Sequence, residues 1–253
     1  MAREYWYFLA GLLAVLVPLA ALFAVKKLDL LEPRPDRRLV YKMVGDRELA
    51  LHVFKAAPAG DTPAPALLLF HGGGWAYGYS RDLYPQCQFL ASRGITCVSA
   101  DYRLGPPGQP DIEGMLEDAA DALLPLRDSA AELAIDASRI TVGGGSAGAH
   151  IAALLGMRAA RKPAGLVLFN PILDLSPGEP HHYLFADNWR DVSPLQKVSS
   201  GVPATLVLVG DRDTDVPLKT VNGFCAAMQE AGNRCEAAIY EGQGHGFFRD
   251  RPG

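Results

Sequence analysis

Short apolar runs recur along the chain with helical stretches between them, and this alternation limits the possible folds more than any other feature. The runs are Ala66–Phe70, Thr96–Ala100, Arg139–Val142, Leu166–Phe169, Thr205–Val209 and Glu236–Tyr240. Runs of this kind are typical of strands that are covered on both faces. The helical stretches are Tyr84–Arg93, Ile112–Ser129, Ala147–Ala160 and Leu218–Ala231. The pattern predicts an α/β fold in which helices cover both faces of a mostly parallel sheet.

Two earlier runs, Leu39–Val44 and Leu49–Phe54, flank a Gly-Asp-Arg turn and predict an antiparallel hairpin at the start of the sheet. The hairpin brings the expected number of strands to eight. A chain of 253 residues has room for one large α/β domain or at most two small ones. We therefore expect a single domain over residues 39–253.

The N-terminal segment Tyr5–Val25 contains no charged residue. At about 1.5 Å per residue, a helix of this length crosses the roughly 30 Å hydrocarbon core of a bilayer. Residues 1–27 are therefore interpreted as a membrane anchor, with a long signal peptide as the alternative and a buried core helix as a third. Pro33 and Pro35 mark residues 28–38 as a short, stiff linker.

Basic residues leave the side of the membrane open. More of them follow the apolar segment than precede it, which favours a cytoplasmic domain. The residues that follow it are Lys26, Lys27, Arg34, Arg37 and Arg38. Long domains can cross a membrane regardless of this rule. The expected localisation is therefore either membrane-anchored or exported.

Composition excludes several classes of protein. The net charge is −4 and the sequence contains no basic block, so nucleic acid is not an expected partner. The four cysteines form no Cys-x-x-Cys pair, so a zinc finger or a thioredoxin-type motif has no support. The sequence does not indicate an oligomeric state.

The cysteines repeat one arrangement twice. Cys87 and Cys97, and likewise Cys225 and Cys235, lie ten residues apart, in a predicted helix and in the strand that follows it. One interpretation is four buried thiols, and the other is two local disulfides, Cys87–Cys97 and Cys225–Cys235. Disulfides would imply export, in conflict with the distribution of basic residues.

A G-x-S-x-G pentapeptide, Gly144 to Gly148, lies between a predicted strand and a predicted helix. A serine in such a turn is exposed at the edge of the sheet, and its small neighbours allow the strand and the helix to approach closely. Ser146 is therefore a candidate nucleophile. The alternative is a glycine-rich turn that holds an inert serine.

A second glycine-rich motif, His71-Gly-Gly-Gly-Trp75, directly follows the strand Ala66–Phe70. Successive glycines allow backbone N–H groups to converge on one negatively charged oxygen. Gly73 and Gly74 are candidate oxyanion donors, and Ala147, at the N-terminus of the next helix, is a third. Trp75 is a candidate wall of the substrate pocket. The alternative for this motif is a flexible turn.

A nucleophilic serine needs a base and a carboxylate that orients the base. Of six histidines, His245 alone stands in a loop after the last predicted strand and outside the other motifs. The loop after Thr205–Val209 offers three carboxylates, Asp211, Asp213 and Asp215. The order serine, aspartate, histidine is the one expected in an α/β-hydrolase fold.

Together these motifs resemble the HGGG-bearing acetyl esterase/lipase and carboxylesterase group of the α/β-hydrolase superfamily, which is related to hormone-sensitive lipase. The resemblance covers Leu39 to Phe248 and includes Asp101-Tyr-Arg-Leu104, which is similar to a structural element of that group. It implies the α/β-hydrolase fold. It also implies that Asp213 is the acid of the triad, with Asp211 and Asp215 as its neighbours.

The sequence departs from this group in two places. Gly145 stands where the group usually has an aspartate before the nucleophile, and the N-terminal cap helices are replaced by the apolar segment and the linker. Only the insert of residues 171–202 is large enough to be a cap, so a minimal cap and an open site are expected. Its aromatic residues Tyr183, Phe185 and Trp189 are candidate pocket walls, or else they pack the insert on the sheet.

The expected function is a serine carboxylesterase that hydrolyses short-chain or acetyl esters through an acyl-enzyme intermediate. Its expected partner is a small-molecule ester, and the chemistry needs no metal and no other cofactor. One alternative is an amide-cleaving relative, such as a formamidase or a serine peptidase, on the same fold. The other is a catalytically inactive, membrane-tethered binding protein.

Overall fold

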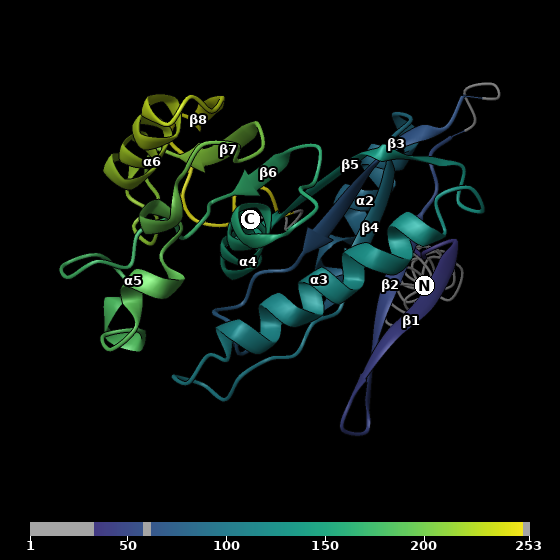
Figure 1. The fold of residues 1–253 in the computed structure, drawn as a ribbon, viewed down its shortest axis with the longest axis horizontal. Helices are drawn as coiled ribbons and strands as arrows, with labels where there is room; N and C mark the ends of the chain where they lie inside the picture. Colours follow the sequence, from purple (N-terminus) through teal and green to yellow (C-terminus); the bar gives the residue numbers. More distant parts are fainter. Residues whose placement is uncertain (1–32, 58–61, 250–253) are drawn as a thin grey trace, which may run out of the picture. The chain divides into compact units, whose positions relative to one another are not determined.

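The computed structural model describes residues 33–57 and 62–249 and contains one sheet of eight strands in the order β1-β2-β4-β3-β5-β6-β7-β8 (Figure 1). The strands are β1 (Arg37–Val44), β2 (Arg47–Phe54), β3 (Ala64–Phe70), β4 (Thr96–Ala100), β5 (Ile135–Gly145), β6 (Leu166–Phe169), β7 (Thr205–Gly210) and β8 (Cys235–Tyr240). β2 pairs antiparallel with β1 and with β4, and all other neighbours pair in parallel. The predicted eight-stranded, mostly parallel sheet is confirmed.

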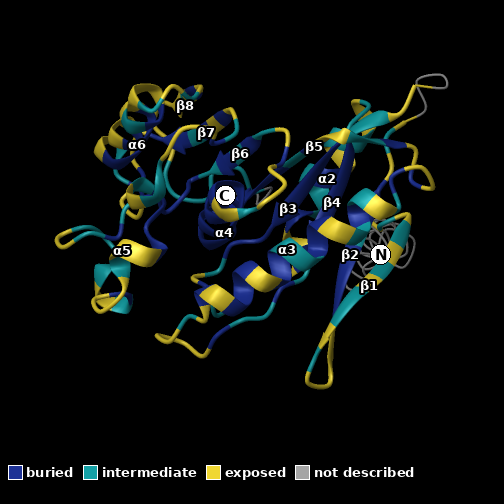
Figure 2. Ribbon diagram, in the orientation of Figure 1, coloured by how far each residue is buried: buried dark blue, intermediate teal, exposed yellow. Residues whose placement is uncertain are grey.

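The four predicted helices are present in the predicted order, on both faces of the sheet, and a short fifth helix lies in the insert. They are α2 (Tyr84–Ser92), α3 (Ile112–Asp128), α4 (Ala147–Arg158), α5 (Trp189–Val192) and α6 (Leu218–Glu230). Neighbouring side chains of β3 show the two layers. Leu68 and Phe70 belong to the large core under α3, α4 and α6, whereas Leu67 and Leu69 belong to a smaller core under α2 (Figures 1 and 2).

Many element boundaries differ from the expectation by a few residues, and the starts of two strands differ in ways that matter for the sheet. β1 begins at Arg37, so the last two residues assigned to the linker belong to the sheet. β5 begins at Ile135 rather than Arg139, because Ile135 pairs with Ala64 before a register shift, and the ladder resumes at Ile140. Polar residues within this register shift interrupt the apolar run. The sequence pattern therefore predicts only the central part of the strand and misses its start.

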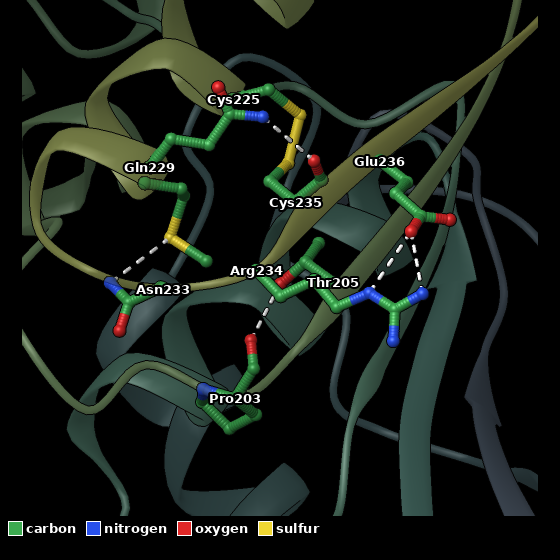
Figure 3. Close-up of a disulfide and its surroundings, with 9 residues drawn as sticks. Pro203, Thr205, Cys225, Gln229, Asn233, Arg234, Cys235 and Glu236 are labelled. Carbon is green, nitrogen blue, oxygen red and sulfur yellow. Dashed lines mark hydrogen bonds and ion pairs between the residues drawn. A yellow bond between two sulfur atoms is a disulfide. The ribbon is translucent and has the colours of Figure 1, made fainter.

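Each cysteine pair forms a disulfide between a helix and the next strand. Cys87 of α2 is bonded to Cys97 of β4, and Cys225 of α6 is bonded to Cys235 of β8. Figure 3 shows the second bridge, beside which the Gln229 side chain donates to the Cys235 carbonyl at 3.2 Å. Of the two interpretations that the sequence left open, the structure contains the disulfides.

The apolar segment Tyr5–Val25 and most of the predicted linker lie outside the described residues. Within residues 33–57 and 62–249, no helix is both long enough and apolar enough to cross a bilayer.

Candidate active site

Ser146 lies in the sharp turn between β5 and α4. Its φ of +54° is left-handed, which is uncommon for a residue other than glycine and indicates strain held by the surroundings. The turn is anchored by the Ser146 N–H, which donates to the Phe169 carbonyl at 2.8 Å. A Cβ added to Gly148 would lie 2.1 Å from the Phe70 carbonyl oxygen, so only glycine allows α4 to begin this close to β3.

The structure brings Ser146, His245 and Asp213 into one chain of hydrogen bonds. His245 Nε2 lies 2.9 Å from Ser146 Oγ, and His245 Nδ1 lies 2.9 Å from Asp213 Oδ2. With the imidazole in its Nδ1–H tautomer, the serine hydroxyl donates to Nε2, and Nδ1–H donates to the carboxylate. This is the geometry required for a base-activated nucleophile.

Asp213 is buried and accepts hydrogen bonds at both carboxylate oxygens. Oδ1 accepts the backbone N–H groups of Asp215 and Val216, each at 2.9 Å. Oδ2 accepts from His245 and from the side-chain amide of Asn170. Burial by itself would raise the pKa of Asp213, but these hydrogen bonds outweigh it and hold the pKa of this carboxyl below its usual value.

The two neighbouring carboxylates have other partners. Asp211 Oδ1 accepts the Gly242 N–H at 2.7 Å and so ties its loop to the loop that carries His245. Asp215 Oδ2 lies 3.9 Å from His245 Nε2, and its side chain is 50% exposed. Asp213, Asp215 and His245 together are also spaced as metal ligands. A metal there would compete for the same atoms that connect His245 to Asp213.

The His71–Gly74 loop lies beside the nucleophile. A Cβ added to Gly72 would lie 3.2 Å from Ser146 Cβ, and a Cβ added to Gly73, where φ is +130°, would lie 2.1 Å from the Tyr77 carbonyl oxygen. In the described part of the chain, the N–H groups of Gly73, Gly74 and Ala147 donate to no other group. They remain available to an oxyanion.

Tyr102 supports this loop through its hydroxyl and its ring. It belongs to the Asp-Tyr-Arg-Leu element, and its hydroxyl donates to the His71 carbonyl at 2.8 Å while its ring stacks on the His71 ring. The next residue, Arg103, forms a two-pronged ion pair with buried Asp118 of α3, at 2.7 and 2.8 Å. The element thus connects the glycine loop to the helical layer.

Trp75 is a core residue and connects the loop to the insert. Its side chain is 1% exposed, and its ring packs edge-on against Phe185 of the insert, which is 3% exposed. Trp75 Nε1–H donates to Nδ1 of buried His150 at 3.2 Å, and His150 Nε2–H donates to the Val192 carbonyl at 2.7 Å. Loop, helix α4 and insert are therefore fastened through one neutral histidine.

His150 makes the stability of the fold sensitive to acid. Burial lowers the pKa of His150 from the ordinary value of 6.5 to about 4. As the pH falls below 6.5, the unfolded chain binds a proton that the folded protein does not bind. The free energy of unfolding should therefore decrease between pH 6.5 and 4, by about 3 kcal/mol from this residue. Urea unfolding at several pH values across this interval measures the decrease.

The matched variant is His150→Asn, whose amide offers hydrogen-bonding groups but does not titrate. It should be less stable than the parent at neutral pH, and the difference should shrink as the pH falls. Parallel stability curves for the two proteins would show that His150 does not carry this pH dependence.

Of the other two candidate aromatics of the insert, Tyr183 lies at the surface and Trp189 is partly buried against the main core. Tyr183 is 77% exposed. Trp189 begins the short helix α5, where Arg190 stacks on its ring at 4.3 Å. His181 has a left-handed φ of +66°, and its ring packs edge-on against Trp75. The insert has one short helix and two 3₁₀ turns, His182–Leu184 and Pro194–Lys197, and so forms only a small cap.

Three residues at the site were missed by the sequence interpretation. Asn170 follows β6, has a left-handed φ of +46°, and donates its side-chain amide to the Asp213 carboxylate. Phe248 and Arg249 fold back from the His245 loop onto Gly145 and Gly72. Motif spacing carries no signal for these contacts.

Comparisons with known proteins give a consistent family. Residues 67–189 match the family described as alpha/beta hydrolase fold. Esterase LipC of Mycobacterium tuberculosis is 28% identical over 248 residues, which cover 83% of this chain and 59% of LipC. Esterase LipQ of the same organism is 28% identical and is covered to 51%. The chain thus spans about half to three fifths of the length of these curated relatives.

Solved structures of similar length give a closer match. The propionate-bound form of esterase 2 from Thermogutta terrifontis is 33% identical and superposes with a TM-score of 0.74, covering 86% of this chain and 87% of that one. The form of this esterase phosphonylated by sarin has the same identity and coverage, with a TM-score of 0.76. The similarity therefore extends over nearly the whole described domain.

Proposed function

Because this chain belongs to the α/β-hydrolase fold family, we propose that it is a serine carboxylesterase acting on short-chain or acetyl esters. The observation that carries the proposal is the unbroken hydrogen-bond chain from Ser146 through His245 to Asp213. An inactive binding protein would have no need of a strained serine that is held at hydrogen-bond distance from an oriented imidazole.

In the proposed acylation step, Ser146 Oγ attacks the ester carbonyl carbon as His245 Nε2 takes the hydroxyl proton. Ionised Asp213 stabilises the imidazolium that forms and keeps Nδ1 protonated. The N–H groups of Gly73, Gly74 and Ala147 receive the developing oxyanion. The imidazolium then gives its proton to the leaving alkoxide, which departs as the alcohol and leaves an acyl-Ser146.

In the deacylation step a water molecule replaces the alcohol. His245 removes a proton from the water as it attacks the acyl carbonyl, and the same N–H groups stabilise the second oxyanion. Collapse of this intermediate returns the proton to Ser146 Oγ and releases the carboxylic acid. Each step uses the same three side chains, so the loss of any one should slow both halves of the reaction.

The proposed preference for short acyl chains rests on two supports. The small insert carries a single four-residue helix, and Trp75 and Phe185 fill the space beneath it rather than lining an open acyl tunnel. In addition, the similar Thermogutta esterase binds propionate and butyrate.

A fluorophosphonate probe and a substrate panel test the proposed activity. The purified protein should incorporate one probe per chain and should hydrolyse p-nitrophenyl acetate and butyrate faster than the palmitate. Matched p-nitroanilides should react more slowly, since the same triad must then expel an amine. Faster cleavage of the anilides would favour the amide-cleaving alternative, and a chain that is neither labelled nor active would refute the proposal.

We also propose that the domain is exported and tethered by Tyr5–Val25. The two disulfides support this, because such bonds persist in oxidising compartments and are rare in the cytosol. The basic residues after the apolar segment oppose it, but they do not retain long domains. Titration of unreduced, denatured protein from its native host should find no free thiol. Four free thiols would place the domain on the reducing side.

A further inference from the structure

Arg249 reaches the nucleophile from the C-terminal end of the domain. A Cβ added to Gly72 would lie 3.0 Å from Arg249 Nη2 and 3.2 Å from Ser146 Cβ, so both groups border the same point of the glycine loop. The guanidinium occupies this place because Gly72 has no side chain. A cation therefore lies beside the atoms on which an ester would bind.

The chain before Arg249 holds it in this position. Its N–H donates to the Gly246 carbonyl at 2.9 Å, which closes a turn directly after His245. The preceding Phe248 ring covers Gly145 and packs against Phe169 at 5.0 Å between ring centroids. The Phe248 carbonyl accepts the Gln86 side-chain amide at 2.6 Å. Contacts with three separate elements thus fix the approach of Arg249.

The charge of Arg249 is not balanced by the residues that surround it in the described chain. The side chain is half-buried, and no carboxylate within residues 33–57 and 62–249 forms an ion pair with it. The two carboxylates at the triad both lie close to His245: Asp213 Oδ2 is 2.9 Å from Nδ1 and Asp215 Oδ2 is 3.9 Å from Nε2. A partly buried guanidinium without an anion is unfavourable. Its planar donors match a carboxylate.

We propose that Arg249 forms an anion subsite, and that the preferred substrates are esters carrying a free carboxylate in the acyl or the alcohol part. This inference rests on the proposed esterase activity and names its substrate class. Binding the substrate carboxylate would neutralise the guanidinium and orient the ester toward Ser146.

Two matched substrate pairs test the subsite. One pair is p-nitrophenyl hydrogen succinate and its methyl ester, which differ only in the charge of the acyl part. The other is 4-acetoxybenzoate and its methyl ester, which differ in the charge of the alcohol part. The full-length enzyme should prefer the anion of at least one pair by about tenfold in kcat/KM, the scale of one charge-assisted hydrogen bond. The pair that responds identifies which part of the substrate carries the carboxylate.

In Arg249→Gln this preference should fall to within about twofold, and Arg249→Lys should retain part of it. The matched control is Arg161→Gln, which removes the same charge from an exposed loop beyond the far end of α4 and should keep the preference. Probe labelling of each variant reports an intact nucleophile independently of substrate. Labelled enzyme without an anion preference, or a preference that survives Arg249→Gln, would overturn the subsite. Absence of labelling in the parent would instead count against the esterase proposal.

Discussion

Ser146→Ala is expected to reduce kcat for p-nitrophenyl acetate by up to about 10⁶-fold, as removal of a serine nucleophile does in other triads. The variant leaves His245, Asp213 and the glycine loop in place, so any residual rate comes from binding and oxyanion stabilisation alone. Alanine at position 146 must adopt the same left-handed conformation, because the surrounding chain imposes it. Steady-state kinetics measure the fall in kcat, and fluorophosphonate labelling measures the loss of the nucleophile.

The matched control is Ser92→Ala at the C-terminal end of α2. Its hydroxyl is exposed and donates only to the Phe89 carbonyl. This variant should retain parental kcat and labelling. Thermal unfolding of Ser146→Ala should remain cooperative, which separates loss of the nucleophile from loss of the fold. Undiminished hydrolysis by folded Ser146→Ala would show that another group performs the attack.

The position of Ser146 was predictable because local sequence alone creates the turn. A strand, a run of small residues and a helix follow one another without interruption, and the structure contains each of them at the expected place. His245 was found by elimination, since it alone follows the last strand in a loop. For the acid, the residues offered three carboxylates, and only the family resemblance favoured Asp213. The structure distinguishes them by what each side chain contacts.

The supporting residues were not predictable, because their roles depend on contacts between distant segments. Asn170 reaches Asp213 across two strand ends, 43 positions apart in the chain. Trp75 reads as a pocket residue beside a glycine motif, yet His150 and Phe185 bury its ring. Such contacts arise from the topology of the sheet, in which parallel strands end side by side although their sequences are far apart.

Asp213→Asn is expected to lower kcat by about 10⁴-fold, because it reverses the direction of the hydrogen bond between residue 213 and His245. The carbonyl oxygen of the new amide would still accept the backbone N–H groups of Asp215 and Val216. Its NH₂ group would then face His245 Nδ1 and donate to it, so the ring proton would move to Nε2. A protonated Nε2 cannot accept the hydroxyl proton of Ser146. Because the defect lies in the tautomer rather than in a pKa, raising the pH should not restore the rate.

Asp215→Asn distinguishes the triad acid from its neighbour. Asp215 Oδ2 lies 3.9 Å from His245 Nε2 on a half-exposed side chain, so it contributes only a solvent-screened attraction to the imidazolium. Its removal should lower kcat by less than about tenfold and should leave labelling intact. The reverse order of effects, a large loss in Asp215→Asn and a small one in Asp213→Asn, would assign the acid to Asp215. The two variants change the same charge by the same chemistry, two residues apart. A difference of three orders of magnitude between them would therefore come from the contacts that Asp213 makes and Asp215 lacks, above all the hydrogen bond to His245 Nδ1.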